Sequence, residues 1–303
     1  MQTPHSWRCA HDIVADSALN VLLREFLPDM ERLSGGQLTV SLHPDGELGG
    51  PDDMVDMLAR NEIQMHPVSG MILSRLTPVV AIEGFPFAFG TSKEACAAMA
   101  GAPGDRVRDA LRQLGIHAFR AVLPQGLNHV FSRGRRIERA TDLDGLRIRV
   151  GNSPYLKDLY RSLGCDPQPV DLQHVTAALA DGRAEGVEMT INSVERSPRH
   201  RHMDHIAMVG IRFACFWLCV NLDAWQMLDA PTQERLEAHF ETLAARYSED
   251  MDRLHEESLS VLESKGYTVT EVHREGLVTR LKESGFIERW RAHAGIAHTE
   301  EPS

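Results

Sequence analysis

The sequence lacks the cysteine patterns that mark a disulfide scaffold or a zinc ribbon. Its 303 residues include five cysteines, an odd number, and no Cys-x-x-Cys pair occurs among them. We expect Cys9, Cys96, Cys165, Cys215 and Cys219 to be small apolar residues of the interior rather than partners in bridges. Unpaired thiols are more typical of a reducing compartment, which counts against export.

Excess positive charge and long apolar runs are also missing. The net charge is -11 and the densest basic stretch is Arg133–Arg139, so no extended basic face is available for nucleic acid. The most apolar stretch, Ile206–Leu222, is shorter than the roughly 20 residues that a spanning helix needs and is interrupted by Arg212. We therefore expect neither a nucleic-acid partner nor a membrane segment.

Motifs of targeting, cofactor binding and catalysis are absent as well. Residues 1–10 contain no basic segment followed by an apolar one, so the chain as given predicts no signal peptide. No phosphate-binding loop, dinucleotide fingerprint or nucleophile elbow occurs. The sequence thus predicts no cofactor and gives no reason to expect an enzyme.

Short β-rich runs alternate with amphipathic segments, which is typical of an α/β protein long enough for two domains. Strands are predicted at 7–13, 37–42, 63–68, 117–123, 146–150 and 267–272. Helices are predicted at 17–33, 52–60, 92–100, 105–114, 155–163, 172–180 and 277–293. A Gly- and Arg-rich passage begins at Pro124, and the run Ile206–Leu222 is a candidate strand crossing between the domains.

The strongest architectural signal is a single long helix. Asp229 can cap it, Pro231 fits its first turn, and its apolar spacing continues until Gly266. At 1.5 Å per residue this helix would be roughly 50 Å long, which is longer than one small domain is wide. We expect it to lie across both domains, with a coiled-coil dimer as the alternative.

One histidine-rich string could hold metal. His200, His202, Asp204 and His205 match the H-x-H-x-D-H zinc motif of metallo-β-lactamase-fold hydrolases, in which imidazoles and a carboxylate hold zinc that activates water. The motif lies late in the chain, after a polar stretch, and lacks convincing downstream ligands. A zinc-dependent hydrolase is therefore the alternative function, and a solvated loop without metal is the preferred interpretation.

A pair of arginines on one predicted strand suggests a different chemistry. Strand alternation places Ile148 and Val150 on one face and Arg147 and Arg149 on the other. A guanidinium at the end of a strand presents a planar fork of donors that suits a carboxylate. Composition alone leaves open whether these arginines bind a ligand or only face solvent.

Several motifs, taken in order, resemble the solute-binding subunits of tripartite ATP-independent periplasmic (TRAP) transporters, the dicarboxylate- and sialic-acid-binding family. The resemblance runs almost from end to end. It is carried by Ala10-His11, Ser34–Gly36, His43–Gly49, Gly84–Phe87, Asp142–Val150, Leu163–Pro167, Ala178–Gly182, Glu185–Glu188, and Asn221 with Trp225.

The resemblance implies a periplasmic binding protein-like fold with hinge strands and a long helix spanning both domains. Domain I would comprise 1–123 and 212–252, and domain II would comprise 124–211 and 253–303, with the ligand cleft between them. It also implies that the protein is periplasmic and monomeric and delivers its ligand to integral membrane subunits. A dimer through the long helix is the alternative to the monomer.

The family's carboxylate-binding arginine falls on Arg149, and Arg147 would point outward. The remaining ligand-binding positions implied by the match are His11, Ser69, His129, Leu172, Glu188, Met189, Phe216 and Trp217. Asn128-His129 stand where many relatives carry a further arginine, and Met189 replaces an asparagine. These departures predict a monocarboxylate with an apolar or aromatic body, held without a second arginine.

Overall fold

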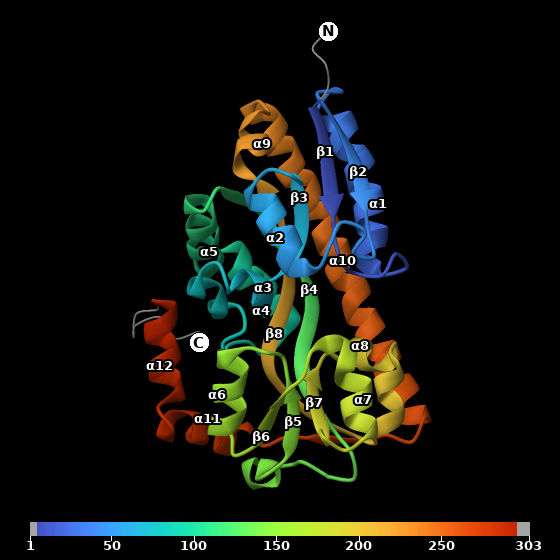
Figure 1. Ribbon diagram of the computed structural model, residues 1–303, viewed down its shortest axis with the longest axis vertical. Coiled ribbons are helices and arrows are strands. Elements are labelled where there is room, and N and C mark those ends of the chain that lie inside the picture. Colours follow the sequence, from blue (N-terminus) through green and yellow to red (C-terminus); the bar gives the residue numbers. More distant parts are fainter. Residues whose placement is uncertain (1–4, 296–303) are drawn as a thin grey trace. The chain divides into compact units, whose positions relative to one another are not determined.

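The computed structural model describes residues 5–295 and divides into two compact units (Figure 1). Within the described residues, unit 1 comprises 5–85, 91–125 and 214–251, and unit 2 comprises 86–90, 126–213 and 252–295. These limits lie close to the domain boundaries predicted at 123, 211 and 252, and the predicted ends at 1 and 303 lie outside the described residues. The fold class is α/β, as predicted, and the strands of the described residues form one mixed sheet.

Unit 1 begins with alternating strands and helices. Its sheet has the order β2-β1-β3-β8, in which β1 pairs in parallel with β2 and β3, and β3 pairs antiparallel with β8. The elements are β1 (His5–Ala10), α1 (Ala18–Leu33), β2 (Leu38–His43), α2 (Pro51–Ala59), β3 (Met65–Ser69), α3 (Gly70–Leu73), η1 (Pro78–Ile82), α4 (Ser92–Ala100), α5 (Ala102–Gln113) and α9 (Leu222–Gln226).

Local sequence explains the first helix of unit 1. The Ser17 side chain caps α1 by accepting a hydrogen bond from the Asn20 N–H. Apolar side chains at helical spacing, among them Leu19, Leu23 and Phe26, are fully or almost fully buried. Helix α1 packs this stripe against β2, so the first βα unit forms part of the core of unit 1.

Unit 2 has the sheet order β4-β7-β5-β6, with β9 paired in parallel to the first part of β8. Its elements are η2 (Ala140–Leu143), β5 (Arg147–Val150), α6 (Pro154–Ser162), β6 (Asp166–Pro169), η3 (Leu172–His174), α7 (Val175–Ala180), β7 (Gly186–Met189), α8 (Ile191–Glu195), η4 (Pro198–His202), β9 (Thr268–Glu271), α11 (Arg274–Glu283) and α12 (Phe286–Ala294).

Two clusters of buried side chains form the core of unit 2. One contains Ile148 and Val150 of β5 together with Leu159 and Tyr160 of α6. The other contains Val187 of β7 and apolar residues of α7 and α8. Because side chains alternate along each strand, the two clusters lie on opposite faces of the sheet of unit 2. Each face therefore packs against different helices.

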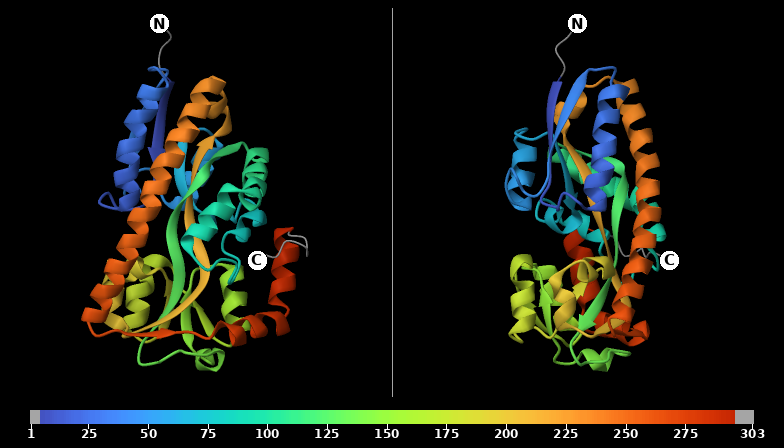
Figure 2. Two further views of the ribbon diagram at one scale, coloured as in Figure 1. Left: turned by 180° about the vertical axis from the view of Figure 1, so that it is seen from behind. Right: turned by 90° about the vertical axis from the view of Figure 1, so that its right-hand side faces the viewer.

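Three elements contribute residues to both units: β4 (Ile116–Ser132), β8 (His205–Asn221) and α10 (Ala230–Ser264). The single long helix was predicted and is continuous (Figure 2). The crossing strand predicted at 206–222 is also confirmed. The strand predicted at 117–123 is too short. Strand β4 continues past Pro124 and Gly126 to Ser132, and its residues 129–132 pair with β7.

Two further sequence predictions need correction. The last helix, predicted at 277–293, is divided into α11 and α12 by Gly285, whose φ of 68° lies in the left-handed region. The segment Pro86–Gly90, predicted in domain I, groups with unit 2. Phe87 explains the second change, since its N–H donates to the Ile211 carbonyl at 2.8 Å and its ring packs on the core of unit 2.

Candidate ligand-binding site

Arg149 lies on β5, between β6 and β7 in the sheet of unit 2. Its strand neighbours Ile148 and Val150 are buried, as alternation predicted, and Arg149 pairs with Val187 of β7. The Nε–H donates to the Val170 carbonyl at 2.7 Å, which fixes the side chain. Among the described residues the two terminal Nη groups have no hydrogen-bond partner, so the fork of donors is available.

The charge of Arg149 is partly removed from water. Burial lowers the pKa of Arg149 to about 10, an effect that the nearby Glu188 opposes and that Arg199 and Arg212 reinforce. The guanidinium therefore remains charged at neutral pH. Because its surroundings have a lower effective dielectric constant than water, an anion bound there would interact with it more strongly than in bulk solvent.

Glu188 already has a cationic partner inside unit 2. Its Oε2 accepts a hydrogen bond from Nη2 of Arg212 at 3.2 Å, and Oε1 lies 2.7 Å from Nε of Arg212. The Nε–H does not point at Oε1, so that contact is an ion pair without a directed hydrogen bond. The Glu188 side chain is 3% exposed, and its pairing with Arg212 was not predicted.

The other predicted residues of unit 2 lie on neighbouring elements. His129 of β4 pairs with Met189 of β7, and the adjacent Val130 pairs with Glu188. The Nδ1 atom of buried His129 accepts the Gly210 N–H at 3.2 Å. Leu172 begins η3 and is 54% exposed. The structure thus brings His129, Glu188 and Met189 together on adjacent strands.

In unit 1 the predicted residues gather where β3 ends. Ser69 pairs with Phe216, and Val68 pairs with Trp217 on β8. Ser69 and Phe216 are half-buried, whereas Trp217 is fully buried and its indole N–H donates to Glu83 at 2.5 Å. The polar end of Trp217 is therefore occupied by a neighbour in unit 1.

His11 follows the last residue of β1, the strand that lies beside β3 in the sheet. It is fully buried, its Nδ1 accepts the Ile13 N–H, and its Nε2 forms a 3.2 Å hydrogen bond with Asn20. Burial lowers the pKa of His11, so the ring is neutral near pH 7. A direct contact between His11 and a ligand stays a prediction.

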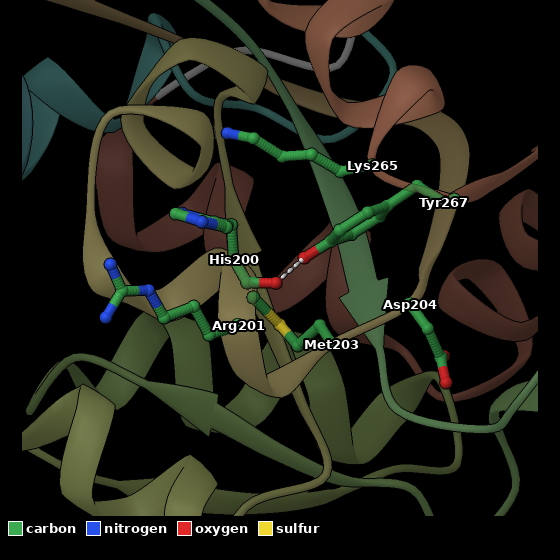
Figure 3. Close-up of a pocket in the computed structure, with 7 residues that line it drawn as sticks. His200, Arg201, Met203, Asp204, Lys265 and Tyr267 are labelled. Atoms are coloured by element: carbon green, nitrogen blue, oxygen red, sulfur yellow. Dashed lines mark hydrogen bonds between the residues drawn. The ribbon is translucent and has the colours of Figure 1, made fainter.

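The histidine-rich string does not assemble a metal site. His200 and Asp204 line a cavity of about 360 Å³ in unit 2, but Figure 3 shows the Asp204 carboxylate directed away from the His200 ring. Nδ1 of His200 lies 2.6 Å from the Ser197 carbonyl, and Nε2 of His205 accepts the Ile137 N–H. No group of three or more metal-type ligands occurs between residues 5 and 295. The hydrolase alternative therefore has no support.

The sequence interpretation missed three charged residues: Arg199, Arg212 and Glu83. A signal existed for Arg212, since it is the one charge inside the apolar run of β8 and a buried charge requires a partner. Glu83 likewise follows an apolar segment and is 5% exposed. Arg199 gave no such signal, because it lies in a polar stretch rich in arginine and histidine.

One known family matches most of the chain. The profile of the family described as bacterial extracellular solute-binding protein, family 7, matches residues 13–284. The chain belongs to this family. A curated relative, the 2,3-diketo-L-gulonate-binding periplasmic protein of Escherichia coli, is 24% identical over 189 residues, which is 62% of this chain and 57% of the relative.

Solved structures of TRAP periplasmic solute-binding proteins share the fold over nearly the whole chain. A TRAP periplasmic solute-binding protein from Roseobacter denitrificans with bound β-D-glucuronate has a TM-score of 0.85 at 18% identity, covering 95% of this chain and 94% of its own. One from Desulfovibrio salexigens with bound orotic acid also has a TM-score of 0.85 at 18% identity, covering 96% and 94%. The present chain has the TRAP solute-binding fold.

Membership in family 7 makes the protein a solute-binding protein rather than an enzyme. Cys9, Cys165, Cys215 and Cys219 are buried, as expected of small apolar residues, and Cys96 is partly buried. Over residues 5–295, none of the helices has the length and apolar character required to cross a membrane.

Proposed function

We propose that this protein captures a small organic acid in the periplasm and delivers it to the membrane subunits of a TRAP transporter. Arg149 binds the carboxylate of the acid through its two free Nη groups. The observation that carries the proposal is this half-buried guanidinium, which one backbone carbonyl fixes and which has no other hydrogen-bond partner among residues 5–295. A planar fork in that state matches the two oxygens of a carboxylate.

The neighbourhood of Arg149 supports binding without chemistry. Glu188 and Arg212 neutralise one another, so neither presents an unpaired base or nucleophile beside the guanidinium. The relatives that carry β-D-glucuronate or orotic acid hold carboxylate-bearing ligands. The remaining predicted positions, including Ser69, His129 and Phe216, stay predicted ligand contacts, and closure by hinge motion stays a prediction of the family resemblance.

Ligand-induced thermal stabilisation tests the role of Arg149. The unfolding temperature of the purified protein is measured with D-glucuronate, orotate, succinate and butyrate, since a ligand that binds only the folded state raises that temperature. Arg149→Ala should abolish every stabilisation seen with the wild type, because truncating one partner of a buried charge pair costs about 2–5 kcal/mol of binding free energy. Arg149→Lys should also bind weakly, because an ammonium lacks the planar fork.

Arg147→Ala is the matched control for this experiment. It removes the same charge two positions away on β5, where the side chain is exposed and paired with Glu185 at 2.8 Å. This variant should retain wild-type stabilisation by every acid. Full stabilisation of Arg149→Ala would remove Arg149 from the proposal.

A further inference from the structure

Arg199 is a second arginine of unit 2, and most of its donors have no partner among the described residues. It lies on η4 and is half-buried, and its Nε is inaccessible to water without a hydrogen-bond partner. Its Nη2 lies 3.5 Å from the Leu172 carbonyl, at the limit of a hydrogen bond. Among the described residues no carboxylate forms an ion pair with Arg199.

Arg199 and Arg149 lie on the same side of the sheet of unit 2. Arg149 pairs with Val187, whose side chain belongs to the core cluster that α7 and α8 cover. The η4 turn that carries Arg199 packs against both of these helices. In addition, the two guanidinium groups contact the carbonyls of Val170 and Leu172, which are two residues apart in one segment.

The charges of this region do not balance. Arg212 is paired with Glu188, and no other carboxylate between residues 5 and 295 forms an ion pair with Arg149 or Arg199. Asp171 acts on Arg149 electrostatically but is exposed to solvent. Burial lowers the pKa of Arg199, and Arg199 in turn lowers the pKa of Arg149. Two partly desolvated like charges are unfavourable unless an anion compensates them.

A structural role explains Arg199 poorly. Arginines that stabilise a fold usually place several of their five donors on carbonyls or carboxylates. In this chain Arg280 shows that pattern, with hydrogen bonds to both oxygens of Asp144 and to the Leu163 carbonyl. Arg199 has one long contact instead, so its remaining donors are available to a ligand.

We propose that Arg199 is the second anion-binding group of unit 2, and that the preferred ligand is an organic dianion with one carboxylate on Arg149 and the other on Arg199. This inference rests on the proposed function and specifies its substrate class. It replaces the monocarboxylate expected from the sequence. That expectation rested on the lack of an arginine at Asn128-His129, where many relatives carry one. The second guanidinium comes from a different element, η4.

Two pairs of acids that differ in one carboxylate test the proposal. Dissociation constants are measured by titration calorimetry for succinate against butyrate, and for galactarate against galactonate. The wild type should bind at least one dianion no less than tenfold more tightly than its monoanionic partner. Arg199→Ala should remove that preference by weakening the dianion alone, with the monoanion affinity unchanged within about twofold.

Arg201→Ala is the matched control, since Arg201 lies in the same η4 turn but is exposed. It removes the same net charge and should leave both affinities unchanged. Equal affinity of the wild type for both members of each pair would overturn the role of Arg199 while Arg149 binding stands. Equal weakening of both members by Arg199→Ala would overturn it as well. If the wild type bound none of the four acids, both proposals would be overturned.

Discussion

The two units differ in how fully some of their buried ionisable side chains are hydrogen-bonded. In unit 1 the Glu83 carboxyl is enclosed by its neighbours, with the Trp217 indole N–H and the Cys215 thiol both donating to Oε2. In unit 2 the Arg149 and Arg199 guanidinium groups are also withdrawn from water, yet most of their donors have no partner in the described part of the chain. A satisfied buried group contributes to the fold, whereas an unsatisfied one retains its capacity to bind.

Unit 2 also contains a largely buried arginine that has a partner, Arg212. Its guanidinium carries the same charge as that of Arg149, but its ion pair with Glu188 gives it a partner within the protein. We therefore interpret Arg212 as a structural arginine and keep Arg149 and Arg199 as the two proposed binding arginines. Changes that disturb a satisfied group should affect stability, and changes to Arg149 or Arg199 should affect ligand affinity instead.

The largest loss of stability is expected for Arg212→Ala. This change leaves the buried Glu188 without its cation, which typically costs about 3–5 kcal/mol. The free energy of unfolding in urea, measured without ligand, checks the value. The double variant Arg212→Met with Glu188→Leu should recover most of the loss, because removing both charges leaves none unpaired. A loss below about 1 kcal/mol for Arg212→Ala would contradict the structural role.

A smaller loss, about 2–3 kcal/mol, is expected for Gly70→Ala in unit 1. A Cβ at Gly70 would lie 1.9 Å from Oε1 of Glu83, so the carboxyl would have to leave its hydrogen-bonded position. Gly101→Ala is the control, because the nearest atom to its added Cβ is 3.5 Å away. The same urea titration measures both variants, and equal stability of the two would argue against a fixed Glu83.

The smallest effect concerns pH and His129. Burial, assisted by the charges of His255 and Arg274, lowers the pKa of His129 to about 3. Between pH 6.5 and 3 the unfolded chain takes up a proton that folded His129 excludes, so stability present above pH 6.5 declines as the pH falls. His129 should contribute about 1–2 kcal/mol of the loss between pH 6.5 and 5.

His129→Asn, whose side-chain oxygen can accept the Gly210 N–H in place of Nδ1, should reduce that dependence. Unfolding free energies at pH 6.5 and 5 for this variant and the wild type give the comparison. The exposed His293 provides the control, since His293→Asn should leave the slope unchanged. An unaltered slope in His129→Asn would show that other groups carry the acid sensitivity. Buried His66 of unit 1, whose pKa is lowered to about 4, acts in the same direction.

Local signals made several elements predictable. The Ser17 cap and the apolar stripe after it located α1, and Gly266 marked where α10 would end. Strand alternation placed Ile148 and Val150 inward and left Arg149 on the other face. The continuation of β4 beyond Pro124 was missed, because pairing with β7 holds those residues extended against a local turn signal.

The sequence by itself determined the α/β class, the long helix and the family, and it predicted Arg149 as the anchor, since each depends on local periodicity or on ordered motifs. Only the tertiary structure decided which charged residues are satisfied. Arg212 meets Glu188 from 24 residues away, Trp217 meets Glu83 from 134 residues away, and Arg199 approaches the Arg149 region through the packing of η4. Whether a charge stabilises or binds depends on those distant partners, which spacing along the chain does not reveal.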